Sequence, residues 1–194
     1  MNLTPELRDE YRRLWNTMQI RPERISAVDT ILKRILLSVP RYHAITQSTG
    51  VPWYLVAVIH SLEAGGNWKT HLHNGDPLTA RTKQVPRGRP RTGSPPFTWE
   101  ASAEDALRYD GLADWKDWSP PGLLFTLEGF NGWGYRRYHA KVLTPYLCSF
   151  SNHYDRGKYV ADGVWDARAV SGQCGAAVLL RRLADRDQIK ITED

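Results

Sequence analysis

Apolar side chains recur at helical spacing through most of the chain. A first amphipathic helix is predicted from residue 4 to about residue 18, with Thr4 as its cap. A second is predicted within residues 22–39, where the apolar positions keep the 3.6-residue period until Pro40 ends the run. Residues 41–47 are expected to form a short third helix.

The segment from Pro52 to Glu63, PWYLVAVIHSLE, is apolar on nearly every side. Its β-branched and aromatic residues would also suit a buried strand. Its length, the proline in its first turn and the stop at Gly65-Gly66 favour a helix instead. Because a helix that is apolar nearly all round belongs in the middle of a bundle, we expect this one to be buried, with Glu63 at its end.

Residues 69–98 have a different character, because turn-forming residues cluster there and Thr79, Arg81 and Lys83 alternate with other side chains. This pattern predicts a small β-hairpin with loops. Helical patterns then return in residues 102–112, 121–130, 138–150 and 167–186. The predicted fold is mainly α (α+β), a helical domain with one small β-hairpin. We expect a single domain over residues 1–194, with the helices of residues 1–48 packing on it.

The composition bounds the class of protein. With 194 residues, 41% hydrophobic and 24% charged, the chain can bury one core, and no apolar run approaches the roughly 18 residues that a membrane span needs. Stable membrane insertion is therefore not expected. The first twenty residues lack the apolar centre of a secretory signal, so we expect synthesis in the cytoplasm without a signal peptide. Cys148 and Cys174 are too few for a disulfide framework, and whether they pair stays open.

The formal net charge of +5 predicts attraction to a polyanion, such as nucleic acid, an anionic membrane face or bacterial cell wall. Part of this charge forms a basic edge of four arginines, Arg81, Arg87, Arg89 and Arg91. Such an edge suits the carboxylates of wall polymers as well as phosphates. No zinc finger, helix-turn-helix signature or aromatic-glycine RNA motif accompanies it, so nucleic acid is not an expected partner.

Glu63 is the candidate catalytic residue because of its position. A carboxylate at the C-terminal end of a helix faces the negative end of the helix dipole, and this one also adjoins apolar surface. Both effects are expected to raise its pKa. A carboxyl group that is protonated near neutral pH can deliver a proton to a glycosidic oxygen, and Ala64-Gly65-Gly66 would leave space for a polymer beside it.

A buried helix ending in glutamate, a glycine turn, a polar hairpin and further helices together resemble the lysozyme-like superfamily of muramidases and lytic transglycosylases. Residues 54–68, YLVAVIHSLEAGGNW, are similar to the catalytic-helix stretch of that group. Residues 127–135, LEGFNGWGY, are similar to its later helix-end segment, which lines the sugar groove. Over roughly residues 50–180 the chain resembles phage and prophage endolysin-type lysozymes more closely, in strings such as HLHNGDPLTARTKQVPRGRP and SFSNHYDRGKYVADG. The resemblance implies cleavage of the β-1,4 bond between N-acetylmuramic acid and N-acetylglucosamine in peptidoglycan, with Glu63 as general acid and no cofactor or metal.

A second catalytic group is expected to stabilise the oxocarbenium-like transition state or to activate water. Asp76 is the first candidate, because its Asn-Gly-Asp turn follows the helix closely and a hairpin folding back would bring it opposite Glu63. Thr79 and Thr82 of the same segment are candidates for holding a water, and Glu128 is a reserve carboxylate. The serine that commonly follows the glutamate in the transglycosylase group is alanine here, so hydrolysis and lytic transglycosylation both stay open.

Sugar contacts are expected from the later helix-end segment. Asn131 and Tyr135 are candidates to bind N-acetyl sugars, Trp133 offers a stacking face, and Arg81 and His73 are further candidates on the hairpin side. Peptidoglycan is the expected partner, and a monomer is the expected state. The resemblance to phage proteins implies that a holin-like pore, a secretion machine or lysis would bring the protein to the cell wall.

Two other classes of function stay open. His60, His71, His73 and Asp76 could supply the three ligands of a zinc-dependent peptidase that cuts wall peptides, although their spacing is not that of His-Glu-x-x-His. A non-catalytic module that binds the cell wall would also use basic charge and exposed aromatic rings. Such modules are often small and repetitive, unlike this chain.

Overall fold

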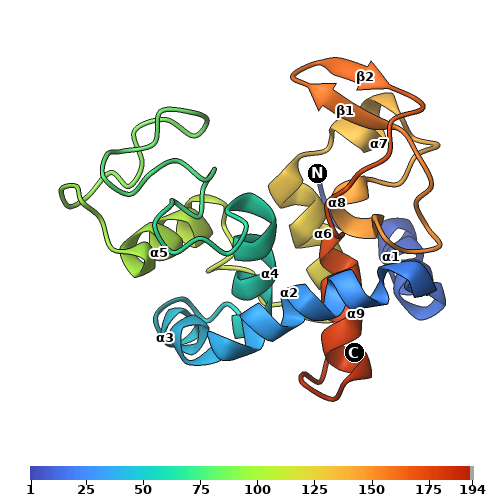
Figure 1. The fold of residues 1–194 in the computed structure, drawn as a ribbon, viewed down its shortest axis with the longest axis horizontal. Helices are drawn as coiled ribbons and strands as arrows, with labels where there is room; N and C mark the ends of the chain where they lie inside the picture. Colours follow the sequence, from blue (N-terminus) through green and yellow to red (C-terminus); the bar gives the residue numbers. More distant parts are fainter. Residues whose placement is uncertain (193–194) are drawn as a thin grey trace. The chain divides into compact units, whose positions relative to one another are not determined.

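The computed structural model describes residues 1–192 and is mainly helical, with one two-stranded antiparallel sheet (Figure 1). The helices are α1 (Pro5–Thr17), the short 3₁₀ helix η1 (Pro22–Arg24), α2 (Ile25–Leu37), α3 (Val39–Thr49), α4 (Trp53–Glu63), α5 (Trp99–Tyr109), α6 (Pro120–Asn131), α7 (Gly134–Tyr138), α8 (Pro145–Cys148) and α9 (Ala176–Asp185). The strands are β1 (Lys158–Ala161) and β2 (Val164–Asp166). The predicted α+β class is confirmed. Among the described residues, no helix is long and apolar enough to cross a bilayer.

The chain groups into two compact units. Unit 1 comprises residues 1–32 and the chain from residue 117 onward, and unit 2 comprises residues 33–116. Because the boundary falls within α2, the N-terminal helices of residues 1–48 are divided between the two units. A single domain over the whole chain stays a prediction, and each unit is described by itself below.

In unit 1, helix α1 forms where the sequence predicts it and packs against α6. Thr4 caps it, because its hydroxyl oxygen accepts a hydrogen bond from the Leu7 amide at 3.3 Å. Tyr11 on its apolar face is fully buried. Helix α9 packs against α8 so closely that a Cβ at Gly175 would overlap the carbonyl oxygen of Leu147. Any residue larger than glycine would therefore clash at position 175.

In unit 2, helix α4 forms as predicted, and nearly all of it from Leu55 to Leu62 is buried. It packs against α3, which in turn packs against α5. The third helix is longer than predicted, because Pro40 lies in the first turn of α3, where its missing amide costs no hydrogen bond. Gly50 ends α3 in the left-handed conformation, with φ +76°.

The hairpin predicted within residues 69–98 is wrong in position. Within the described chain, this segment forms turns and one isolated bridge between Thr70 and Pro77, and no strand. Five prolines in the segment remove amide donors that a strand ladder would need. In addition, the Asp76 carboxylate accepts hydrogen bonds from the amides of Lys83 and Gln84, so these donors are also unavailable to a partner strand.

The observed hairpin, β1–β2, lies in unit 1. Asp162 and Gly163 join its strands, Gly163 at φ +69°, and Tyr159 pairs with Trp165 across them. An Asp-Gly pair between runs of aromatic and β-branched residues is a strong hairpin signal, and here it marks the hairpin that was predicted instead within residues 69–98.

Two helix predictions near the C-terminus were too long. Residues 138–150 hold only the end of α7 and the short α8, and within residues 167–186 the helix α9 begins at Ala176. Both thiols are buried and free, and burial raises the pKa of Cys148 and of Cys174 to about 12. These cysteines therefore behave as small apolar core residues.

Candidate functional site

Glu63 is the last residue of α4 and is half-buried. Directly after it the chain reverses, because the amides of Ala64 and Gly66 both donate to the carbonyl oxygen of His60, at 3.2 and 3.0 Å. Gly65 and Gly66 have φ values of +58° and +72°, a region that side chains rarely adopt. The helix end is therefore closed by a turn without bulky side chains, as the sequence predicted.

The Asn74–Asp76 turn packs on this helix end. A Cβ at Gly75 would lie 3.0 Å from the carbonyl oxygen of Glu63, and Gly75 has φ +78°, so both space and conformation require glycine. The Gly75 amide donates to the carbonyl oxygen of His71 at 2.9 Å, which fixes the turn. The turn that carries Asp76 thus lies against the end of α4. An opposed arrangement of the two carboxyl groups stays a prediction.

Asp76 organises the loop that follows it. Its Oδ2 accepts hydrogen bonds from the amides of Lys83 at 2.8 Å and Gln84 at 3.0 Å, and from Nδ2 of Asn74 at 3.1 Å. The bond from the Gln84 amide is the main cause that holds the pKa of Asp76 below its usual value. The carboxylate is therefore ionised at neutral pH, and all three of these bonds reach one of its two oxygens.

The two candidate threonines differ in what their hydroxyls do. Thr82 is buried, and its hydroxyl donates to the carbonyl oxygen of Pro86 and accepts from the Arg89 amide at 2.9 Å. The loop therefore occupies it, which leaves the proposed contact with a water without structural support. Thr79 is exposed and lines a groove described below.

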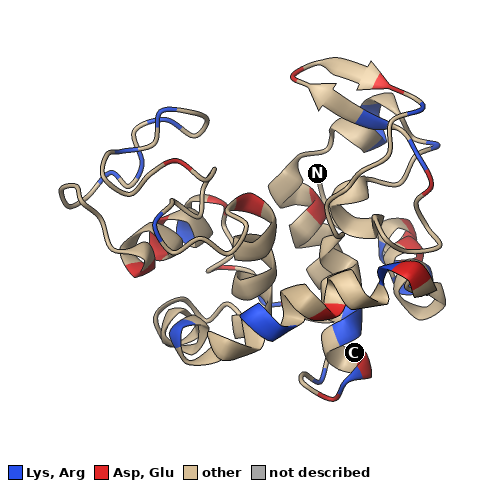
Figure 2. Ribbon diagram, in the orientation of Figure 1, with Lys and Arg blue, Asp and Glu red and all other residues tan. Residues whose placement is uncertain are grey.

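The other candidates on this loop also have partners within unit 2. Nε2 of buried His73 lies 2.8 Å from Asp105, which also forms a two-bond ion pair with Arg89. Nη2 of Arg81 donates to the carbonyl oxygen of Gly93 at 2.7 Å. Figure 2 shows the basic residues of the loop before α5 in blue. Two of the arginines in this loop, Arg81 and Arg89, form the contacts within unit 2 just described. Sugar contacts by His73 or Arg81 stay predictions.

A groove of about 430 Å³ opens in unit 2 beside the Asp76 loop. Trp68 and Phe97 form part of its wall, with Thr79 exposed at its edge. The guanidinium of Arg41 lies 3.8 Å from the centroid of the Trp68 ring and is paired with Glu100 at 2.6 Å. Aromatic rings beside hydrogen-bonding charged groups suit a sugar ring, which has apolar faces and polar edges. Neither tryptophan of this groove, Trp68 or Trp99, was among the candidates predicted from the sequence.

His60 lies in an aromatic cluster behind this groove and is fully buried. Its ring is 4.5 Å from that of Trp68 and 4.7 Å from that of Trp99, and its Nδ1 is hydrogen-bonded to the Tyr42 hydroxyl at 3.0 Å. Burial lowers the pKa of His60 from 6.5 to about 4. The imidazole is therefore a neutral core group at pH 7.

This burial predicts an acid-sensitive unit. Between pH 6.5 and about pH 4, His60 is protonated in the unfolded chain but not in the native chain. The free energy of unfolding therefore decreases as the pH falls through this window, by up to about 3 kcal/mol. Urea denaturation at pH 7 and pH 5 measures the loss, and His60→Gln is expected to reduce it. His43→Gln, at an exposed position of α3, is the matched control. An unchanged pH dependence in His60→Gln would contradict the assignment.

The zinc site considered from the sequence does not form. His60 bonds to Tyr42, His71 to Ser102 and to the carbonyl of Ala80, and His73 and Asp76 to the partners already described. Within residues 1–192, no three His, Cys, Asp or Glu side chains lie close enough together to hold a metal ion. The geometry therefore gives no support to a zinc peptidase.

The sugar-contact candidates of the later segment belong to unit 1. Asn131 is exposed at the end of α6, and Trp133 packs on Phe125 with ring centroids 5.1 Å apart. Tyr135 is only 9% exposed, and its hydroxyl accepts from the Tyr159 amide at 3.3 Å. Tyr135 thus anchors β1 within unit 1. Sugar binding by these three residues stays a prediction.

Glu128, the reserve carboxylate, is a buried structural group of unit 1. It is 3% exposed, its Oε2 accepts from the Tyr11 hydroxyl at 2.6 Å, and its Oε1 lies 2.8 Å from Nε of Arg136. Arg136 also binds Glu10 through two hydrogen bonds, at 2.9 and 3.2 Å. Burial raises the pKa of Glu128, and the bonds from Tyr11 and Arg136 oppose this. This network gives Glu128 a role in the fold that the sequence did not reveal.

The chain matches no family model, no curated protein and no solved structure. The likeness to lysozymes therefore depends on the sequence segments quoted above. Within unit 2, the turn that carries Asp76 packs against the end of α4 at Glu63, and the aromatic groove opens beside the Asp76 loop.

Proposed function

We propose that the protein is a peptidoglycan-cleaving glycosidase of the lysozyme-like type, with Glu63 as general acid. The observation that carries this proposal is the packing of the Asn74–Asp76 turn on the end of the buried helix that Glu63 terminates. Two carboxylates in unlike surroundings belong to this corner of unit 2, one ending an apolar helix and one ionised within a hydrogen-bonded loop. Unlike surroundings are what allow two carboxyl groups to divide acid and charge-stabilising roles in glycosidases.

In the proposed reaction, the Glu63 carboxyl group protonates the glycosidic oxygen, and the N-acetylglucosamine side leaves as an alcohol. The ionised Asp76 stabilises the positive charge that develops on the muramic acid ring. Water or the muramic 6-hydroxyl then attacks the same carbon, and its proton returns to Glu63. Attack by water gives hydrolysis, and attack by the 6-hydroxyl gives a 1,6-anhydro product.

Two further features support a wall polymer as the substrate. The groove lined by Trp68 and Phe97 places apolar surface beside the ion pair of Arg41 and Glu100, a combination that suits sugar rings. The net charge of +5 favours approach to anionic wall polymers. In this proposal the protein acts as a monomer on peptidoglycan and needs no nucleic acid partner.

The charge of Asp76 can be tested apart from its role in the loop. Asp76→Asn keeps an oxygen that accepts the Lys83 and Gln84 amides but loses the negative charge. We expect cleavage to slow by about 10²-fold, the usual size of one lost electrostatic contact to a transition state. The assay is the rate of release of soluble wall fragments, measured well below the unfolding temperature. An unchanged rate would restrict Asp76 to a structural role.

The products test the proposal itself. Purified peptidoglycan is digested with the protein, and the soluble fragments are analysed by mass spectrometry. Fragments with reducing or 1,6-anhydro muramic ends support a glycosidase and distinguish the two forms of the reaction. Cleaved peptide stems, with activity lost in EDTA and recovered with zinc, would overturn the proposal in favour of a peptidase. Binding to the wall without any release would overturn it in favour of a binding module.

A further inference from the structure

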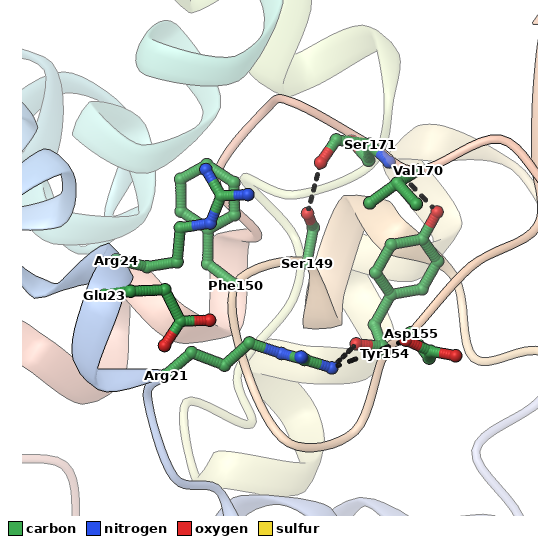
Figure 3. Close-up of a pocket in the computed structure, with 9 residues that line it drawn as sticks. All are labelled: Arg21, Glu23, Arg24, Ser149, Phe150, Tyr154, Asp155, Val170 and Ser171. Carbon is green, nitrogen blue, oxygen red and sulfur yellow. Dashed lines mark hydrogen bonds and ion pairs between the residues drawn. The ribbon is translucent and has the colours of Figure 1, made fainter.

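A second cavity, of about 130 Å³, lies in unit 1, away in sequence from all residues used in the glycosidase proposal. Its walls come from the η1 turn, from the chain after α8 and from the chain after β2 (Figure 3). This volume corresponds to about four water molecules, so the cavity takes a ligand of only a few heavy atoms.

The walls of the cavity are tied together by hydrogen bonds. Nε and Nη2 of Arg21 donate to the carbonyl oxygens of Ser151 and Tyr154, at 3.1 and 2.7 Å. On the far side, the Ser171 amide donates to the Tyr154 hydroxyl at 3.2 Å, and the Ser149 hydroxyl donates to the Ser171 carbonyl at 3.3 Å. Figure 3 shows the bonds that join Arg21 to Tyr154, Tyr154 to Ser171, and Ser171 to Ser149. The cavity is therefore preformed.

Phe150 is held in an unusual conformation at the edge of this cavity. Its φ is +75°, which is unfavourable for a bulky side chain, and its ring is buried. The Arg21 amide donates to its carbonyl oxygen at 2.9 Å, and the bridge between Ile20 and Ser151 fixes the adjoining chain. Conformations of this kind persist where the surroundings over-determine them, and they cluster at ligand-binding sites.

Two opposite charges face the cavity without pairing. The guanidinium of Arg24 lies 4.7 Å from the centroid of the Phe150 ring. Figure 3 shows the Glu23 carboxylate on the same side of the cavity, apart from that guanidinium and nearer to the Arg21 side chain. Within the described chain, neither side chain forms an ion pair. Arg21 and Asp155 are both paired: they lie 3.9 Å apart as an ion pair, Arg21 also donates to two backbone carbonyls, and Asp155 also pairs with Arg156 at 2.9 Å.

Stacking on a ring uses the face of a guanidinium and leaves its in-plane N–H donors available, an arrangement that suits a carboxylate. The two carboxylates at the cavity, Glu23 and Asp155, disfavour a doubly charged phosphate. A carboxylate joined to an ammonium group meets both unpaired charges. We propose that this cavity binds a small free α-amino acid as its zwitterion, with the carboxylate on Arg24 and the ammonium on Glu23.

The test is a titration of the full-length protein with alanine, in each enantiomer, followed by the backbone amide signals of Phe150 and Ser171 in NMR spectra. Acetate and methylammonium are titrated separately as half-ligands. We expect saturable shifts with alanine at dissociation constants on the order of 1 mM, and binding of either half-ligand about tenfold weaker. No wall substrate is present, so the result is independent of the glycosidase proposal.

Arg24→Gln and Glu23→Gln are each expected to weaken alanine binding about tenfold. Both positions are exposed, so neither change threatens the fold. Arg168→Gln, at an exposed arginine of the same unit, is the matched control and should leave binding unchanged. The proposal is overturned if alanine gives no saturable shifts, if acetate binds as tightly as alanine, or if the Arg24 and Arg168 variants behave alike.

Discussion

Replacement of Glu63 by glutamine is expected to slow glycan cleavage by about 10²–10⁴-fold, the usual contribution of a positioned general acid. Glutamine keeps the size and the polar end of the side chain but has no carboxyl proton to donate. The half-buried position at the end of α4 should therefore be preserved. The measurement is the initial rate of release of soluble muropeptides from purified peptidoglycan, with thermal unfolding recorded for both proteins.

The matched control is Glu104→Gln, since Glu104 is a half-buried glutamate of α5 in the same unit. Its replacement changes the net charge equally and should leave the rate nearly unchanged, because Glu104 lies on α5, outside the end of α4 and the Asp76 loop. If Glu63→Gln retains the rate of the unaltered protein while both proteins remain folded, Glu63 is not the acid. The proposed function would then have to be abandoned.

The parts of the fold that the sequence predicts well depend on local signals. Thr4 at the start of α1 and the paired glycines after Glu63 act on neighbouring residues, so their effect can be read without knowing the fold. The Asn-Gly-Asp turn is local in the same way. Its placement against the end of α4 requires Gly75, where a side chain would meet the carbonyl oxygen of Glu63.

The predictions that failed, or that gained no support, depend on partners far away in sequence. The alternating threonine and basic residues after Asp76 suggested strands, but the prolines and the Asp76 carboxylate remove the amide donors of a ladder. His73 had the chemistry of a ligand, yet Asp105, thirty-two residues later, takes its ring nitrogen. Such pairings are decided by tertiary packing, which a single sequence does not display.

Glu128 is the clearest case of this kind, because its partner Tyr11 is 117 residues away. From its position in the sequence and its carboxyl group alone, Glu128 was predicted as a reserve catalytic residue. Its 3% exposure and its bonds to Tyr11 and Arg136 instead indicate a stabilising role in unit 1. Only the packing of α1 against α6 brings Tyr11 to this carboxylate.

Glu128→Ala is accordingly expected to lower the free energy of unfolding by about 3–5 kcal/mol, because removing one partner of a buried ion pair leaves the other charge poorly compensated. Arg136 would keep only Glu10, and the Tyr11 hydroxyl would lose its acceptor. Urea denaturation at pH 7 measures the change. Glu10→Ala is the matched control: its side chain is 28% exposed, and its removal leaves the bond from Arg136 to Glu128 in place, so a loss of about 1 kcal/mol or less is expected. An equal loss of unfolding free energy in the two variants would show that the buried Glu128 stabilises unit 1 no more than the partly exposed Glu10 does. That result would contradict the structural role assigned to Glu128.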